Sequence, residues 1–395
     1  MKRRSRDQNQ RGTMSNHAGV PDSTTAIRET HNTYWLCGKP RNDLLSAPDA
    51  LLLYLSSVLR NEEIPPPECS LEAWRLLLRS LYPHWVTPIL YGYLRSWDRA
   101  HLPPAEVMEI IRREYLIGKV RSVQMDQQLG EILTAAEDHG IRMLILKGPA
   151  LARSIYSDPA MRGGCDLDLL VCPDQVEETE DLLVALGYRC NNRTFAVSKN
   201  FYHEEMFLPD KNDSGCLAVE IHWRCAPSAG FVTAVPPEEL FSRAVTISTD
   251  KLTFETMAPV DALLHTALHM VFGHTRNIRL TWIHDIALLA GQLRIPEDWA
   301  AVRDASATWG ARNAVEVGLT MAEVWTGLTL PQGFDDFDLW PSPSEREATI
   351  WPDLLRRDES IPSSLKLSLS ALPDRREKIH MLRYLAGRTL KNLFW

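Results

Sequence analysis

The sequence lacks several features that would place it in a specialised class of protein. Its longest apolar runs, such as residues 51–55, are far shorter than the roughly 18–20 residues that a membrane-spanning helix needs. The amino terminus has no apolar segment typical of a secretory signal peptide. The 7 cysteines are odd in number and include no CxxC pair, which argues against a disulfide framework. We therefore expect a cytoplasmic protein with no transmembrane segment.

Positive charge is also scarce. The chain has 43 Lys and Arg residues against 51 Asp and Glu residues, which gives a formal net charge of −8. A chain of this sign has no overall positive field to attract a polyanion. The composition therefore makes no strong case for a nucleic-acid partner.

What remains is an ordinary globular composition, with 45% hydrophobic and 24% charged residues in a chain of 395. Residues 1–33 are rich in Arg, Asn, Gln, Ser and Thr, so we expect a disordered tail there. We predict a helical amino-terminal module over residues 34–140, an α/β core over residues 141–258 and a helical carboxy-terminal module over residues 259–395.

Apolar spacing of three and four residues predicts the helices. A long amphipathic helix begins after Pro104 and ends before Gly140, with an interruption expected near Gly118. Four more helices are expected after Pro259, and a basic amphipathic helix near residues 375–394.

Strands in the core place polar side chains on one face. An apolar strand over residues 141–146 is followed by Lys147 and Gly148 at a turn and then by a short helix. Strict alternation over residues 166–171 puts Asp166 and Asp168 on the same face of a strand. Residues 201–208 and 217–223 read as a hairpin whose second strand presents Glu220 and His222 on one face. Asp174 and Glu177 match a capping box that begins a helix.

These residues suggest phosphoryl or nucleotidyl transfer. Asp166, Asp168 and Glu220 would form a cage of hard oxygen ligands for one or two Mg²⁺ ions. The helix beginning after Gly148 would offer free backbone N–H groups to a triphosphate. His222, on the same face as Glu220, would orient a ligand, relay a proton or make a structural hydrogen bond.

The segment LILKGPALARSIYSDPAMRGGCDLDLLV (residues 144–171), together with VEIHW (219–223) and LTWIHDIALL (280–289), resembles the uncharacterised nucleotidyltransferase family of the DNA polymerase β superfamily. The resemblance implies an α/β (α+β) fold with a small mixed sheet, helices on one of its faces, and flanking helical modules. It also implies transfer of a nucleoside monophosphate from a nucleoside triphosphate, expected to be ATP, to an unknown small-molecule, peptide or protein acceptor, with release of pyrophosphate.

The resemblance also implies roles for individual residues. Asp166, Asp168 and Glu220 would be the catalytic ligands of two Mg²⁺ ions. Lys147, Gly148, Arg162 and Asp285 would line the nucleotide or acceptor site, although Arg162 can equally be an ion-pair partner of a nearby Asp.

Two alternatives from other classes remain open. The protein could be an inactive nucleotide-binding adaptor that keeps the fold. It could also be a metal-dependent phosphohydrolase that uses His265, His269, His284 and Asp285. The plainer interpretation of Asp261, His265 and His269, spaced by four residues, is the polar flank of a helix whose histidines pack between two domains. On that interpretation we expect the purified protein to hold no stoichiometric transition metal.

Overall fold

The computed structural model describes residues 44–164, 166–190, 203–210, 216–225, 235–273 and 278–355, together with residues 25–26, 375–376, 378–379 and 382. Most of the expected disordered tail and most of the expected final helix lie outside these residues.

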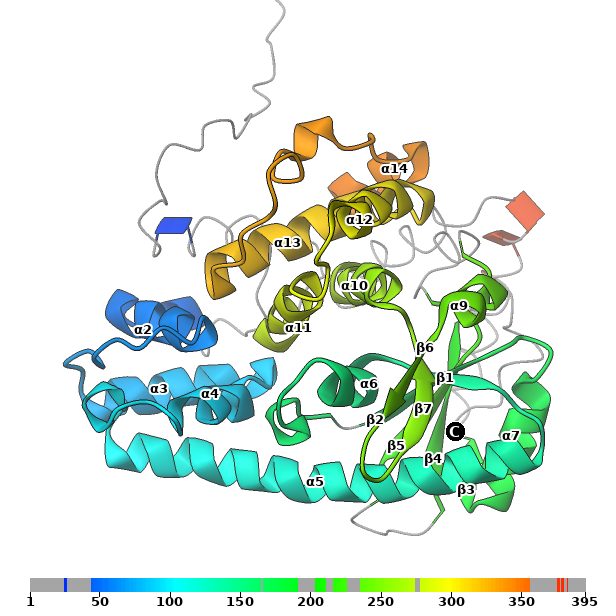
Figure 1. The fold of residues 1–395 in the computed structure, drawn as a ribbon, viewed down its shortest axis with the longest axis horizontal. Coiled ribbons are helices and arrows are strands. Elements are labelled where there is room, and N and C mark those ends of the chain that lie inside the picture. Colours follow the sequence, from blue (N-terminus) through cyan, green and yellow to red (C-terminus); the bar gives the residue numbers. More distant parts are fainter. Residues whose placement is uncertain are drawn as a thin grey trace, which may run out of the picture.

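Helices precede and follow a central sheet, as the sequence predicts (Figure 1). The amino-terminal helices are α2 (Asp49–Leu59), α3 (Leu71–Leu81), α4 (Thr87–Leu94) and α5 (Ala105–Asp138). The central elements are β1 (Met143–Ile145), α6 (Lys147–Ser154), β2 (Asp166–Val171), α7 (Val176–Ala185), β3 (Tyr188–Cys190), β4 (Glu204–Pro209), β5 (Ala218–His222), α9 (Pro237–Arg243), β6 (Val245–Ser248) and β7 (Thr253–Thr256). The carboxy-terminal helices are α10 (Pro259–Leu268), α11 (Leu280–Ala290), α12 (Pro296–Thr308), α13 (Arg312–Thr326) and α14 (Glu345–Leu355).

The described strands form one mixed sheet in the order β3-β4-β5-β2-β1-β7-β6. The pairs β2/β5 and β1/β7 are parallel, and the other neighbours are antiparallel. The predicted hairpin of β4 and β5 is confirmed. The strands β3, β6 and β7, of three or four residues each, were not predicted.

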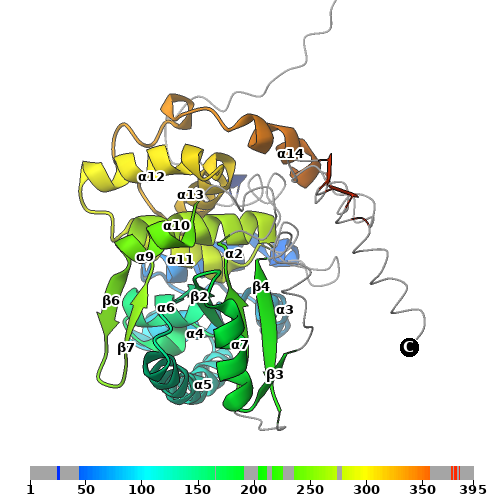
Figure 2. The same cartoon turned by 90° about the vertical axis from the view of Figure 1, so that its right-hand side faces the viewer.

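The alternating side chains of β2 belong to two hydrophobic clusters, one on each face of the sheet. Leu167, Leu169 and Val171 pack against apolar residues of α7 and of the second half of α5. Leu170, on the face that carries Asp166 and Asp168, packs in the cluster that contains α10 and α11. Helices therefore lie on both faces of the sheet rather than on one, and the two faces have separate hydrophobic cores (Figure 2).

Helix α5 is continuous over 34 residues and is not interrupted near Gly118, contrary to the sequence-based expectation. A Cβ atom at Gly118 would lie 2.7 Å from the carbonyl oxygen of Ala160, so glycine is needed for the close approach of two backbones. The expected capping box before α7 is also wrong. The N-cap of α7 is Gln175, whose side chain makes no capping bond and instead donates to the carbonyl oxygen of Gly140.

The two helical modules share one hydrophobic core, which includes residues of α2, α11 and α13. The hydroxyl of Ser56 donates to the carbonyl oxygen of Trp325 at 3.0 Å, and the Nη2 atom of Arg60 donates to that of Val324 at 2.9 Å. Helices from opposite ends of the chain thus pack side by side. Within the described residues, no helix is both long enough and apolar enough to cross a membrane.

Candidate functional site

Strands β2 and β5 bring the predicted carboxylates together. Asp168 and Glu220 are partners in the register of these parallel strands, and Asp166 lies two residues earlier on the same face as Asp168. One ligand atom each from Asp168, Glu220 and His222 lies within 4.8 Å of the others. The side chain of Asp168 is only 3% exposed. The spacing of these acidic residues in the sequence therefore gives a compact cluster.

Two basic side chains bind the same oxygen of Asp168. The ammonium group of Lys147 donates to Oδ1 at 2.7 Å, and Nε2 of His222 lies 2.9 Å from that atom. Lys147 is the first residue of α6 and has a φ of 48°, in the left-handed region that side chains with a Cβ rarely adopt. This turn places its side chain, which is 15% exposed, in the carboxylate cluster.

The amino terminus of α6 lies beside Asp168, because the N–H of Leu146 donates to the carbonyl oxygen of Asp168 at 2.9 Å. Gly148 is buried in the first turn of α6. A Cβ atom there would lie 3.5 Å from Nη1 of Arg162. The free backbone N–H groups of this helix end therefore adjoin the cluster.

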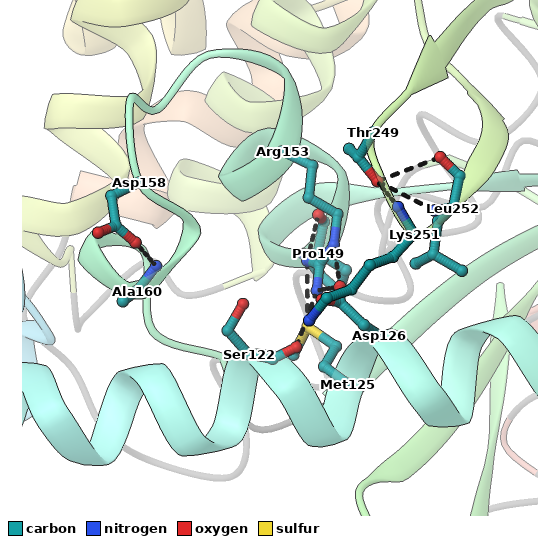
Figure 3. Close-up of polar contacts among 10 residues, drawn as sticks. All are labelled: Ser122, Met125, Asp126, Pro149, Arg153, Asp158, Ala160, Thr249, Lys251 and Leu252. Atoms are coloured by element: carbon teal, nitrogen blue, oxygen red, sulfur yellow. Dashed lines mark hydrogen bonds and ion pairs between the residues drawn. The ribbon is translucent and has the colours of Figure 1, made fainter.

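Helix α6 is held against α5 at its other end (Figure 3). The Nε atom of Arg153 donates to Asp126 at 2.8 Å, and its Nη1 atom donates to the carbonyl oxygen of Pro149 at 2.9 Å. Lys251, in the connection between β6 and β7, lies 3.5 Å from the second oxygen of Asp126. These contacts fix the position of α6 relative to the sheet.

Arg162 and Asp285 form a buried ion pair rather than projecting into open space. Nη2 of Arg162 lies 2.8 Å from Oδ2 of Asp285, and the two side chains are 7% and 0% exposed. The hydroxyl of Tyr156 donates to the other oxygen of Asp285 at 2.7 Å, and Nη1 of Arg162 donates to the carbonyl oxygen of Gly163. Both residues therefore brace the segment that leads into β2.

The structure adds Glu204 and His203, which sequence reasoning missed. Glu204 is the register partner of His222 across β4 and β5, so it lies on the same face of the sheet. Its Oε2 atom is 3.0 Å from Nε2 of His203 and 3.4 Å from Nδ1 of His222. The sequence pair His-Glu at the start of a strand was the available signal, but the register of the hairpin was needed to interpret it.

Electrostatics distinguish the two aspartates. Burial, together with the neighbouring charges of Asp168 and Glu220, raises the pKa of Asp166 to about 6. Asp168 is also penalised by burial, but Lys147 and His222 outweigh this and hold its pKa well below the usual range. Burial and Lys147 act to lower the pKa of His222, yet the nearby carboxylates raise it to about 9. Asp168 is thus already neutralised by bases, whereas Asp166 is not.

The acidic and histidine side chains at the start of α10 are buried, and the packing of these histidines agrees with the plainer interpretation. Asp261 and His265 are 4% and 3% exposed, because α10 packs against α11, α12 and α13 and lies in the core shared with one face of the sheet. Asp261 pairs with Arg243 at 3.0 Å, and His269 packs edge-on against Trp282. Burial and the charges of Lys147 and His222 lower the pKa of His265 to about 3.

His284 lies apart from this row, between the hydroxyls of Tyr93 and Tyr156, each 3.0 Å away. None of these histidines belongs to a metal-capable cluster among the described residues. The arrangement that the phosphohydrolase alternative requires is therefore not formed there.

The chain was compared with solved structures, with curated proteins and with family models. The solution structure of the antibiotic-resistance factor ANT(2'')-Ia is similar with a TM-score of 0.37 at 12% identity, over 49% of this chain and 96% of that one. An antigenic nucleotidyltransferase-like protein from Paracoccidioides brasiliensis is similar with a TM-score of 0.27 at 14% identity, over 48% and 92% of the two chains. No curated protein matches the sequence. The family model described as "Uncharacterised nucleotidyltransferase" matches residues 70–327, and the chain belongs to this family.

Proposed function

We propose that the protein is a Mg²⁺-dependent nucleotidyltransferase that transfers a nucleoside monophosphate from a nucleoside triphosphate, expected to be ATP, to an acceptor. The observation that carries the proposal is the in-register pairing of Asp168 and Glu220 on parallel strands, with Asp166 on the same face. Membership of the nucleotidyltransferase family supports this class of reaction.

The side chains of the cluster fit a divalent cation. Asp166, Asp168 and Glu220 supply the hard oxygen ligands that Mg²⁺ prefers. Among the described residues, the carboxylate of Asp166 has no hydrogen-bond or ion-pair partner, and its pKa is raised to about 6 mainly by burial. Lys147 and His222 are the bases that contact Asp168 directly, whereas Arg162 is paired with Asp285. The ionised form of an unpaired, half-buried carboxylate beside two others is the one that an added cation stabilises most.

The three carboxylates would hold up to two Mg²⁺ ions, and when bound these would polarise the reacting phosphate and favour deprotonation of the acceptor hydroxyl. The amino terminus of α6 and the ammonium group of Lys147 would bind the phosphates of the nucleotide. Arg162 and Asp285 act as positioning residues that hold the start of α6 and the segment before β2.

The chemistry of transfer follows from these positions. An oxygen of the acceptor attacks the α-phosphorus of the nucleoside triphosphate. The bond between the α-phosphorus and its bridging oxygen breaks, and pyrophosphate leaves with that oxygen. The proton of the acceptor hydroxyl leaves to a carboxylate oxygen of the cluster or to water.

The test compares Asp168→Asn with Asp210→Asn, an acidic side chain that directly follows β4 and is 58% exposed. Asp168→Asn removes a charge at nearly constant volume, so we expect affinity for Mg²⁺ in calorimetry to fall at least about 100-fold, while Asp210→Asn changes it little. Equal affinity in both variants would refute the site. Pyrophosphate release across acceptor classes then distinguishes an active transferase from a protein that only binds nucleotide.

A further inference from the structure

A second group of ligand atoms lies next to the carboxylates, on the opposite side of the His222 ring. Its members are His203, which directly precedes β4, Glu204 at the start of β4, and His222 of β5. One ligand atom from each of the three lies within 4.8 Å of the others. The imidazole rings of His203 and His222 have their centroids 5.8 Å apart with an angle of 52° between their planes.

The three side chains converge on a single oxygen atom. Oε2 of Glu204 lies 3.0 Å from Nε2 of His203 and 3.4 Å from Nδ1 of His222. The side chains of His203 and His222 are 15% and 1% exposed, whereas that of Glu204 is 34% exposed. The cluster is therefore buried on its imidazole side and accessible through its carboxylate.

This donor set differs from the carboxylate cage in chemical character. Two imidazole nitrogens and one carboxylate oxygen suit zinc and similar transition-metal ions, whereas Mg²⁺ prefers oxygen ligands alone. The charge balance favours a cation as well, because Glu204 adds a fourth carboxylate to a cluster in which the two bases Lys147 and His222 both bind the same oxygen of Asp168.

His222 already has the partner that a metal-ligating histidine normally has. Its Nε2 atom lies 2.9 Å from Oδ1 of the buried Asp168, which leaves Nδ1 directed to Glu204. A carboxylate that accepts the N–H of the second ring nitrogen fixes the tautomer and the orientation of a metal-bound imidazole. Asp168 would serve this purpose while remaining a ligand of the neighbouring site.

We propose that His203, Glu204 and Nδ1 of His222 form a site for one transition-metal dication of the zinc type, distinct from the proposed Mg²⁺ site and joined to it through His222. Solvent or a substrate atom would complete the coordination, because three protein ligands leave at least one position open. The competing interpretation is a hydrogen-bonded chain in which Glu204 merely accepts from the two histidines.

Calorimetry with ZnCl₂ on chelator-treated, full-length protein separates these interpretations. The wild-type protein should bind one equivalent of zinc with a Kd below about 1 μM. His203→Ala and Glu204→Gln should each weaken zinc binding at least about 100-fold. His139→Ala removes an exposed histidine at the end of α5 and should leave zinc binding unchanged.

Glu220→Gln shows which of the two sites holds the zinc. Glu220 belongs only to the carboxylate site, so this variant should keep the zinc affinity of the wild type, and His203→Ala should keep the Mg²⁺ affinity of the wild type. Failure of the Mg²⁺ titration alone would contradict the proposed function and leave the zinc site standing.

Substitution with Co²⁺ gives a readout that hydrogen bonding alone cannot produce. Imidazole-ligated Co²⁺ should give visible absorption bands that are lost in both Glu204→Gln and His203→Ala, with circular dichroism confirming that the variants are folded. A zinc Kd of the wild type above about 1 μM, or zinc binding that survives both variants, would overturn the proposal. Loss of zinc in Glu220→Gln with retention in His203→Ala would also overturn it.

Discussion

Arg162 and Asp285 lie 123 residues apart in the chain, yet their side chains form an ion pair with an N–O distance of 2.8 Å in the interior. The pair joins the segment before β2 to helix α11. It therefore connects the sheet that carries the carboxylates to the carboxy-terminal helices. Its energetic role can be measured separately from any role in binding nucleotide.

Replacing Asp285 by Asn should lower the free energy of unfolding by about 3–5 kcal/mol, because the guanidinium of Arg162 is left buried without its counter-charge. Denaturant titration measures this change. The matched control is Glu109→Gln, which breaks an exposed pair with Arg112 in α5 and should cost less than about 1 kcal/mol. Equal losses in the two variants would contradict the buried character of the pair.

Gly148→Ala should weaken the binding of Mg²⁺-ATP about tenfold with little change in stability. A Cβ atom at this position would meet Arg162 at 3.5 Å, which is an ordinary contact, but it would stand where a phosphate approaches the helix backbone. Calorimetry and thermal unfolding measure the two effects. Wild-type nucleotide affinity in this variant would place the phosphates elsewhere.

Gly118→Ala should change the stability of the protein rather than its affinity for nucleotide. The added Cβ would lie 2.7 Å from the carbonyl oxygen of Ala160, and a backbone atom cannot move away easily. We expect a loss of about 1–2 kcal/mol in unfolding free energy, net of the better helix propensity of alanine, with nucleotide affinity unchanged. A stabilised variant would show that the two backbones have room to separate.

Lys147→Gln should have opposite effects on metal and nucleotide. Without the ammonium group, the carboxylates lose their nearest cation, so the affinity for Mg²⁺ alone should rise about tenfold. The affinity for the triphosphate should fall, because the proposed contact of Lys147 with a phosphate is lost. Lys251→Gln, which removes a lysine that is 57% exposed, should change neither. Parallel changes in both affinities would refute the assigned role.

Glu347 should make the free energy of unfolding depend on pH. Its carboxylate is buried and accepts from the backbone N–H of Asn313, and burial raises its pKa to about 7. Between its ordinary pKa and pH 7 the folded protein keeps a proton that the unfolded chain has lost, so the unfolding free energy falls as pH rises through this window. The expected fall is about 3 kcal/mol at most.

Glu347→Gln should remove this fall, whereas Glu345→Gln, an exposed acid in the same helix, should retain it. Denaturant titrations between pH 4.5 and pH 7.5 or so measure both. A fall that persists in Glu347→Gln would assign the pH dependence to another group.

The sequence was sufficient wherever a local pattern determines the structure. Period-two alternation located β2, and the three- and four-residue spacing located α10 to α13. Strands β6 and β7 escaped prediction because segments of four residues are defined by the partner with which they pair, rather than by their own pattern. Gly118 was misinterpreted because helix propensity alone does not reveal that another backbone passes close to it.

The candidate site could also be predicted from the sequence only in part. The acidic residues could be selected because Asp166 and Asp168 are adjacent on one strand and the family pattern pairs them with Glu220. Their assignment as ligands remains a prediction. Glu204 could not be found because its proximity to His222 depends on the register of a hairpin. The burial of His265 depends on helices that enclose α10 from several directions, which its own periodicity does not show.

The contact of α2 with α13 has a consequence for synthesis of the chain. The hydroxyl of Ser56 bonds to Trp325, 269 residues later, and apolar residues of both helices share one core. At about 5–20 residues per second, the ribosome needs on the order of tens of seconds to make the intervening chain. During that time α4 can already pack against α2, but the part of α2 that contacts α13 lacks that partner. We therefore expect nascent chains shorter than about 330 residues to depend on chaperones and to be sensitive to protease, and to become resistant only after α13 has emerged.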